Sequence, residues 1–187
     1  MTYERLTVRD FLDRIARTYA TWLKLLEDIE PAQYERPIIA GGWSIKDIIA
    51  HITWHEAQMV GVMKARALVG SDWWQLSTAE RNANIYAQHK GQPLQDVLDE
   101  AKDAHRQLIE GIEPLADEDL NEPGRFADMP VDWLFSDILA QNTYEHHAAH
   151  QTSLGHWLTS QDKSIELKNL AASYGTLKSK STGSKRS

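Results

Sequence analysis

The sequence predicts an all-α protein, a four-helix bundle with a longer crossover between its second and third helices. Three observations lead to this fold class. Four long segments place hydrophobic residues at alternating spacings of three and four, polar capping pairs precede helical segments, and no segment of useful length shows the alternation of a β-strand. The length of 187 residues and a composition of 42% hydrophobic and 25% charged residues suit a globular domain with a sizeable core.

The first two helices are expected on either side of the segment "EPAQ". The first has a capping pair, Thr7 with Asp10, at its start, and the second has Ser44 with Asp47. The hydrophobic stripe of the first helix consists of Val8, Leu12, Ile15, Tyr19, Trp22, Leu26 and Ile29. The stripe of the second consists of Ile48, Ile52, His55, Met59 and Val62. Both patterns predict helices that bury one face.

The crossover spans roughly residues 70–91 and precedes the last two helices. It includes Trp73 and Trp74 and a short helix that begins with the capping pair Ser77 and Glu80. The third long helix begins at Pro93, and its stripe consists of Leu94, Val97, Ala101, Ala104, Leu108 and Leu115. After the turn-rich segment "NEPGRFADMP", the fourth helix is expected to follow Pro130 and to continue to about Thr159.

Residues 1–160 are therefore expected to form the bundle, and residues 161–187 a polar, basic C-terminal tail. The tail contains six basic and two acidic residues, a net charge of +4, which leaves −11 on residues 1–160. Phosphate binding requires a basic face, so an acidic body argues against nucleic acid as a partner. The absence of cysteine excludes disulfides, thiolate metal sites and a cysteine nucleophile. Without an apolar signal region or a membrane-spanning run, we expect a cytoplasmic protein with no membrane partner.

Three histidines lie within five residues in the segment "NTYEHHAAHQTSLGHWL". His146 and His150 are four residues apart, so on a helix their side chains share a face and can chelate one ion. His147 points about 100° away from His146 and is the weaker candidate for a ligand. The stripe of the fourth helix runs through Phe135, Leu139, Asn142, His146, Ala149, Ser153 and Trp157. Small and polar residues in the middle of this stripe favour a cavity over a packed core.

The second helix strengthens the case for a metal site. The segment "HITWHE" places His51 and His55 four residues apart, on or beside the inward stripe. Helix bundles build metal sites from side chains on facing helices, and imidazole suits zinc, nickel, copper or iron. A histidine pair at this spacing also occurs by chance on helix surfaces, so it is the combination of two pairs on two helices that indicates a metal.

The ordered pair of segments "GGWSIKDIIAHITWHE" and "NTYEHHAAHQ" resembles the DinB/YfiT-like superfamily of four-helix-bundle metalloproteins. The "NAxxY" pattern at Asn82–Tyr86 resembles its ClbS/DfsB branch. The resemblance covers most of residues 5–160. It implies that His51, His146 and His150 bind a divalent metal, while His55 and His147 are additional to the pattern. It is also compatible with a homodimer.

Other polar and aromatic residues near these histidines are candidates for supporting roles. Asn142, Glu56 and Ser153 are candidates for catalytic groups, although Glu56, like Glu145, also fits the description of a surface carboxylate. His105 is expected to be a hydrogen-bonded core histidine, with a role beside the metal as the alternative. Trp73 and Trp74 are expected to line the mouth of a substrate site. The tryptophans expected in core or helix-end packing are Trp43, Trp54, Trp133 and Trp157.

The sequence and the resemblance support a function hypothesis with two alternatives. The main hypothesis is a metal-dependent hydrolase that acts on an electrophilic small molecule, in detoxification or self-protection. Hydrolysis is expected because a cation held by neutral imidazoles can ionise a water molecule. Zinc or nickel is the expected metal, with iron or manganese as alternatives. The first alternative is transfer of a low-molecular-weight thiol, which the resemblance implies for some relatives. The second is sequestration of a small molecule without turnover.

Overall fold

A computed structural model describes residues 5–38 and 42–160 of the chain. The chain divides between Gln151 and Thr152 into two compact units. The described residues contain no β-strand, only two isolated bridges, as the all-α prediction requires. The predicted basic tail, residues 161–187, lies outside the described residues, and the predicted boundary at residue 160 stays a prediction. No described helix is long and apolar enough to span a membrane.

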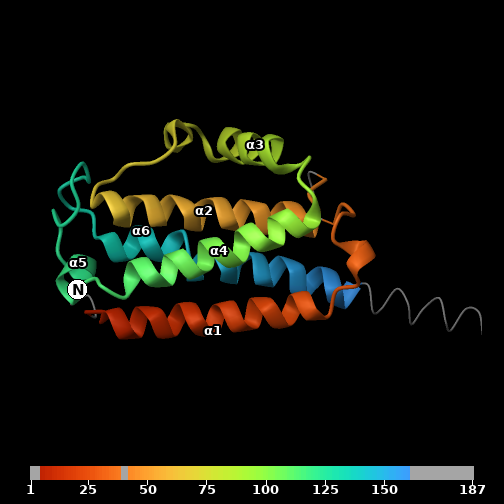
Figure 1. Ribbon diagram of the computed structural model, residues 1–187, viewed down its shortest axis with the longest axis horizontal. Helices are drawn as coiled ribbons and strands as arrows, with labels where there is room; N and C mark the ends of the chain where they lie inside the picture. Colours follow the sequence, from red (N-terminus) through yellow and green to blue (C-terminus); the bar gives the residue numbers. More distant parts are fainter. Residues whose placement is uncertain (1–4, 39–41, 161–187) are drawn as a thin grey trace, which may run out of the picture. The chain divides into compact units, whose positions relative to one another are not determined.

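Four long helical members build the first unit, with shorter helices between them (Figure 1). The elements are α1 (Val8–Glu27), η1 (Pro31–Gln33), α2 (Ile45–Ala65), η2 (Asp72–Gln75), α3 (Thr78–His89), α4 (Leu94–Ile112), α5 (Asp117–Asn121) and α6 (Phe135–Gln141). The chain is helical again over residues 144–160, a segment here called the last helix. Helices α1, α2 and α4 are the first three members of the bundle. The fourth member consists of α6 and the part of the last helix within the first unit.

The three predicted capping pairs are all present and explain where α1, α2 and α3 begin. At α2, the Ser44 hydroxyl accepts a hydrogen bond from the Asp47 N–H at 3.2 Å, and the Asp47 carboxylate accepts one from the Ser44 N–H at 2.8 Å. The pairs Thr7–Asp10 and Ser77–Glu80 make the same two reciprocal bonds. Each pair supplies partners for N–H groups that have none within the helix, so the helix start is specified locally.

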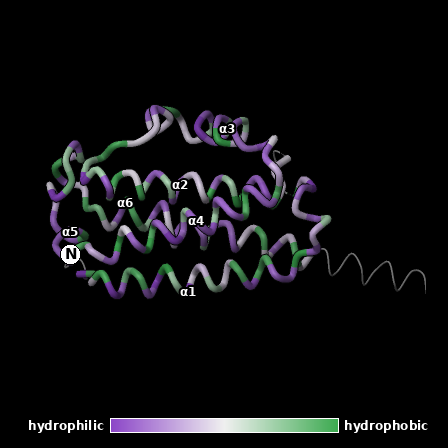
Figure 2. Tube along the Cα trace, viewed as in Figure 1, coloured by the Kyte–Doolittle hydropathy of each residue, from purple (hydrophilic) through white to green (hydrophobic). Residues whose placement is uncertain are grey.

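The hydrophobic core lies where α1, α2, α4 and α6 meet. Fully buried side chains from each of them contribute, including Phe11 from α1, Met59 from α2, Leu108 from α4 and Leu139 from α6. Figure 2 shows that hydrophobic and hydrophilic residues recur along the bundle helices, as expected for amphipathic helices. Trp133, predicted in core or helix-end packing, is 48% exposed, and it lies in the turn that precedes α6.

The fourth helix differs from the prediction of one continuous helix from Pro130 to Thr159. Residues 130–134 form a turn, α6 begins only at Phe135, and the helix is interrupted at Asn142 and Thr143. Hydrogen bonds change at this point. The Thr143 hydroxyl donates to the carbonyl of Leu139 at 2.6 Å, and the Thr143 N–H pairs with Ala140, at 3.2 Å. Thr18 and Thr53 make the same side-chain bond inside unbroken helices, so this bond accompanies the interruption without explaining it.

The predicted crossover between the second and third long helices is confirmed. It contains η2 and α3, and α3 lies along α2 (Figure 1). Helix α3 buries a single side chain, Ile85, so it is attached to the bundle by few apolar contacts. The crossover therefore covers α2 and contributes few side chains to the apolar interior.

Truncation of the core at Leu108 should destabilise the protein strongly. Leu108 is fully buried, so Leu108→Ala leaves a cavity and is expected to reduce the free energy of unfolding by about 2–5 kcal/mol. The matched control is Leu23→Ala, since Leu23 is 42% exposed and the same atoms are removed. Urea denaturation followed by circular dichroism measures both variants. Equal losses in the two would contradict this description of the core.

Candidate metal centre

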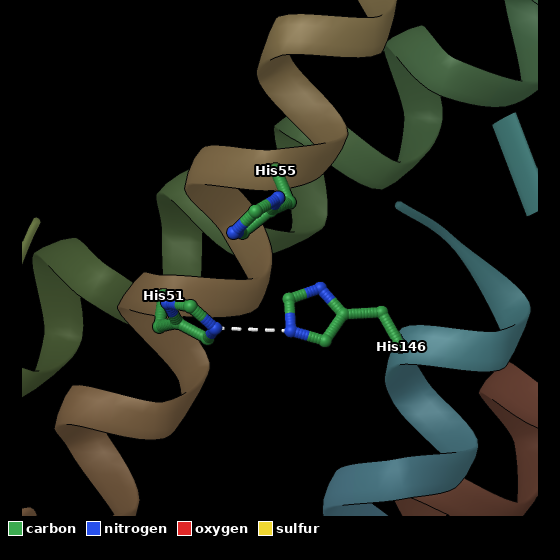
Figure 3. Close-up of side chains that lie close together, drawn as sticks. All are labelled: His51, His55 and His146. Atoms are coloured by element: carbon green, nitrogen blue, oxygen red, sulfur yellow. Dashed lines mark hydrogen bonds between the residues drawn. The ribbon is translucent and has the colours of Figure 1, made fainter. Parts of the chain in front are cut away.

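Histidines from α2 and the last helix meet inside the first unit. The Nε2 atom of His51 lies 2.9 Å from Nε2 of His146, which lies 3.1 Å from Nε2 of His150. Figure 3 shows His51 and His146 pointing at each other from the two helices, with His55 above them on α2. The structure therefore brings together the three ring nitrogens of the predicted ligands. The two helices supply them from positions 95 residues apart in the chain.

These imidazoles are neutral because they are buried together. Burial lowers the pKa of His51 to about 2, with further lowering by His55, His150 and Arg81. Burial likewise lowers the pKa of His150 to about 4, and it shifts the pKa of His146 downward as well. A neutral imidazole presents one nitrogen with a lone pair, which is the form that binds a metal.

The contacts of the rings fit a shared cation. Nδ1 of His51 and Nδ1 of His146 are buried without a hydrogen-bond partner in the described part of the chain. If the ring protons are on these Nδ1 atoms, each Nε2 atom carries a lone pair, and the nearest polar atoms to it are other ring nitrogens. Lone pairs that face one another repel, and a positive charge between them replaces this repulsion by attraction. Ring nitrogens of His51, His55 and His146 also lie within 4.8 Å of one another, so a group of at least three histidines can hold a divalent ion.

His55 is oriented by Asn142, a predicted candidate for a catalytic group. Asn142 is 7% exposed, and its Nδ2 donates to the carbonyl of Ile138 at 2.8 Å. Its Oδ1 therefore faces Nδ1 of His55, 2.7 Å away, and accepts a hydrogen bond from it. This bond places the proton of His55 on Nδ1 and leaves the lone pair on Nε2. The geometry makes Asn142 a residue that positions His55. The sequence had left the role of His55 open.

A second polar cluster lies on another side of α2 and contains Glu56. The prediction that Glu56 is a surface carboxylate is wrong, because its side chain is 2% exposed. Its Oε1 accepts a hydrogen bond from Nε2 of His147 at 2.9 Å. Nδ1 of His105 lies 3.4 Å from the same oxygen, and the His105 ring stacks on Tyr19. Hence His147 faces away from the predicted metal ligands, as its position on the helix predicts, and His105 is a hydrogen-bonded core histidine. The burial of Glu56 was missed because its partners are 49 and 91 residues away.

Aromatic rings line the histidine cluster where the crossover covers α2. Trp74 of η2 meets the edge of His55 with ring centroids 6.0 Å apart, and Trp54 meets it at 4.9 Å. Trp43 meets His51 at 5.2 Å. Trp74 packs so closely on Gly70 that a Cβ at that position would collide with the indole. These rings form an apolar wall beside the histidines, and Trp73 stacks on Trp54. That Trp73 and Trp74 line the mouth of a substrate site stays a prediction.

Two other candidates on the last helix have exposed side chains. Glu145 fits the predicted surface carboxylate. Ser153 belongs to the second unit, and a catalytic role for it stays a prediction. The predicted stripe through Ala149 and Ser153 is wrong because both are exposed, whereas His147 is buried. Buried Thr143, His147 and Leu154 continue one helical face from Leu139, and the predicted stripe followed the neighbouring face through His146.

A family model, the DinB superfamily, matches residues 14–153. The chain belongs to this superfamily. A comparison with curated proteins finds no match in sequence.

Solved structures of DinB-like proteins share the fold. An uncharacterised protein from Escherichia coli UTI89 has a TM-score of 0.71 and 17% identity, over 87% of this chain and 98% of that one. DfsB, described as a sibling lethal factor precursor, has a TM-score of 0.68 and 19% identity, over 84% and 98%. The colibactin self-resistance protein ClbS has a TM-score of 0.67 and 15% identity, over 83% and 96%. The recognition of the superfamily is confirmed, and both proteins that give the branch its name have this fold.

One of these structures overturns the exclusion of nucleic acid as a partner. ClbS was solved in complex with a double-stranded DNA. The exclusion was drawn from the net charge of −11 on residues 1–160, which sums charges over that whole segment. Contact with phosphates depends on the local arrangement of basic groups, so the sum is an insufficient criterion. The homodimer is not tested by these comparisons and stays a prediction.

Removing one predicted ligand should weaken the binding of a divalent metal. His150→Ala deletes one of three converging ring nitrogens. Loss of a residue that only hydrogen-bonds to a ligand lowers metal affinity by up to about 100-fold, so loss of a ligand should lower it by more than that. The control is His156→Ala, because His156 is exposed. Metal content after dialysis, measured by mass spectrometry, tests this, with circular dichroism as the check on folding. Unchanged metal content in His150→Ala would exclude His150 as a ligand.

Neutralising Glu56 should destabilise the protein in a pH-dependent way. Burial raises the pKa of Glu56, but hydrogen bonds from His105 and His147 outweigh it, so the pKa lies below its ordinary value of 4.5. A carboxylate with a lowered pKa stabilises the folded state above that ordinary value and loses this effect as the pH falls through the folded-state pKa. Glu56→Gln should therefore cost about 1–3 kcal/mol near neutral pH, and less in acid.

The control for this prediction is Glu145→Gln, the same change at an exposed position beside a proposed ligand. Urea titrations of metal-free protein at several pH values between 3 and 7 give the comparison. A cost for Glu56→Gln that is as small as for Glu145→Gln, or that grows toward acid pH, would contradict the buried network.

Proposed function

We propose that this protein is a metal-dependent hydrolase that acts on an electrophilic small molecule, in detoxification or self-protection. The observation that carries the proposal is the approach of three Nε2 atoms, from α2 and the last helix, to about 3 Å in a DinB superfamily chain. An inward-facing, neutral group of histidines is suited to a cation and leaves coordination positions for other ligands.

The residues that would hold the ion are His51, His146 and His150. Zinc or nickel suits three imidazoles best, with iron or manganese as the alternatives. Once bound, such an ion supplies Lewis-acid chemistry, which polarises an electrophile and makes water a stronger nucleophile. The protein contributes the fixed positions of the rings, since each ring comes from a helix whose packing sets its direction.

Other residues would prepare the site for a nucleophile and a substrate. His55, held through Nδ1 by Asn142, has its lone pair on Nε2 and accepts a hydrogen bond from a donor that enters the cluster. Trp43, Trp54 and Trp74 surround the rings of His51 and His55 with apolar surface. This surface excludes water from one side and packs against the apolar body of a small molecule.

A turnover experiment separates hydrolysis from the two alternatives. Zinc-loaded protein is incubated with an excess of styrene oxide, with and without cysteine or glutathione. Hydrolysis predicts that water opens the epoxide to a diol, that several equivalents are consumed per site without thiol, and that His150→Ala loses this activity. Consumption that requires a thiol would indicate thiol transfer instead. Binding that stops at one equivalent per site would indicate sequestration.

A further inference from the structure

Arg81, in the first turn of α3, brings a positive charge to the edge of the histidine cluster. It is half-buried, and its guanidinium carbon lies 5.3 Å from the centroid of the Trp74 ring. Trp74 in turn contacts His55. The charge of Arg81 also contributes, after burial and neighbouring groups, to the low pKa of His51 and of His55. Its field therefore reaches both rings of α2 that face the cluster.

The guanidinium of Arg81 has no acceptor among the described residues. Its Nε is buried and makes no hydrogen bond, and no ion pair is formed within residues 5–38 and 42–160. The nearest acidic residue in sequence, Glu80, is bound to Ser77 in the cap of α3. A buried donor without an acceptor costs free energy, so this arrangement favours a partner from outside the chain.

The buried basic side chain Lys46, in contrast, has acceptors, since it donates to the carbonyls of Lys90 and Gln92 at 3.2 and 2.9 Å. Half-buried Arg14 lies over Tyr144 and has no acceptor within the described residues either, but the Nε atom of Arg81 is the one that is buried. The planar guanidinium presents a fork of N–H donors that matches the two oxygens of a carboxylate or a phosphate.

We propose that Arg81 binds an anionic group, a carboxylate or a phosphate, of a small molecule whose apolar part lies against Trp54 and Trp74. The proposal rests on the proposed function in one respect, since it places that molecule beside the histidines where the reaction would occur. It names the class of substrate as an organic anion with an apolar or aromatic body. The aromatic wall and the unpaired guanidinium are adjacent through Trp74, so one small molecule can contact both.

Binding of simple aromatic probes tests this assignment. Benzoate and phenyl phosphate carry the anion, and benzamide is a neutral molecule of nearly the same shape as benzoate. Calorimetric titration of the zinc-loaded full chain should show that both anions bind about tenfold or more tightly than benzamide. Arg81→Met should abolish this preference. Arg9→Met, which removes the same charge from an exposed position of α1, should leave it unchanged.

Two further measurements keep the result unambiguous. Metal-free His150→Ala protein should retain the preference for benzoate over benzamide, because the guanidinium and not the zinc binds the anion. This measurement also separates the two claims. Absence of turnover would contradict the proposed function, whereas the binding of benzoate to metal-free protein tests only the role of Arg81. If Arg81→Met does not fold, Arg81→Lys keeps the charge without the fork and should weaken benzoate binding about three- to tenfold.

The proposal is overturned by any of three results. Benzamide binding as tightly as benzoate would remove the need for a cation. Unchanged benzoate binding in a folded Arg81→Met variant, or in Arg81→Lys where only that variant folds, would show that the guanidinium is not involved. Benzoate binding that disappears with the metal and does not depend on Arg81 would assign the anion to the zinc.

Discussion

The approach of Nε2 of His51 on α2 to Nε2 of His146 on the last helix, 2.9 Å, is the contact on which the rest of the site depends. Along the last helix, His146 and His150 lie on the side of His51, and His147, about 100° further round the helix, faces Glu56. Neighbouring positions in the sequence thereby reach two different polar clusters. Asn142, where the helix is interrupted, holds the ring of His55.

The two clusters differ in whether a carboxylate faces the histidines. Around Glu56, the carboxylate accepts hydrogen bonds from His147 and His105, and Tyr19 covers the His105 ring, although Nδ1 of His147 is buried without a partner in the described part of the chain. Around His51 and His146, ring nitrogens face ring nitrogens, and two Nδ1 atoms are buried without partners in the described part of the chain. A buried group of bases without a balancing charge is costly for folding alone. Such an arrangement is typical of a site whose last component is a ligand.

Much of the fold follows from local rules and was predictable. The capping pairs at Thr7, Ser44 and Ser77 specify helix starts through contacts three residues apart, and the hydrophobic stripes specify which faces are buried. The pairs of histidines four residues apart, together with the family resemblance, identified the three rings that converge. The interruption at Asn142 and Thr143 was not predictable from periodicity, because both residue types are also tolerated inside a helix.

Features that depend on distant contacts escaped the sequence analysis. Glu56 seemed a surface carboxylate because its partners lie on the last helix and on α4. Arg81 gave no signal, since its position over Trp74 follows from how the crossover folds on α2. The expected absence of a nucleic-acid partner was overturned by the ClbS complex, because net charge contains no information on where charges lie.

X-ray absorption on protein purified without an affinity tag or added metal tests most directly whether histidines of two helices share one cation. The account predicts about one equivalent of a divalent metal per chain, with a first shell that contains three imidazole nitrogens at about 2.0–2.1 Å for zinc. Protein that retains no divalent metal when offered zinc or nickel, or that binds it through oxygen ligands without imidazole, would contradict the account.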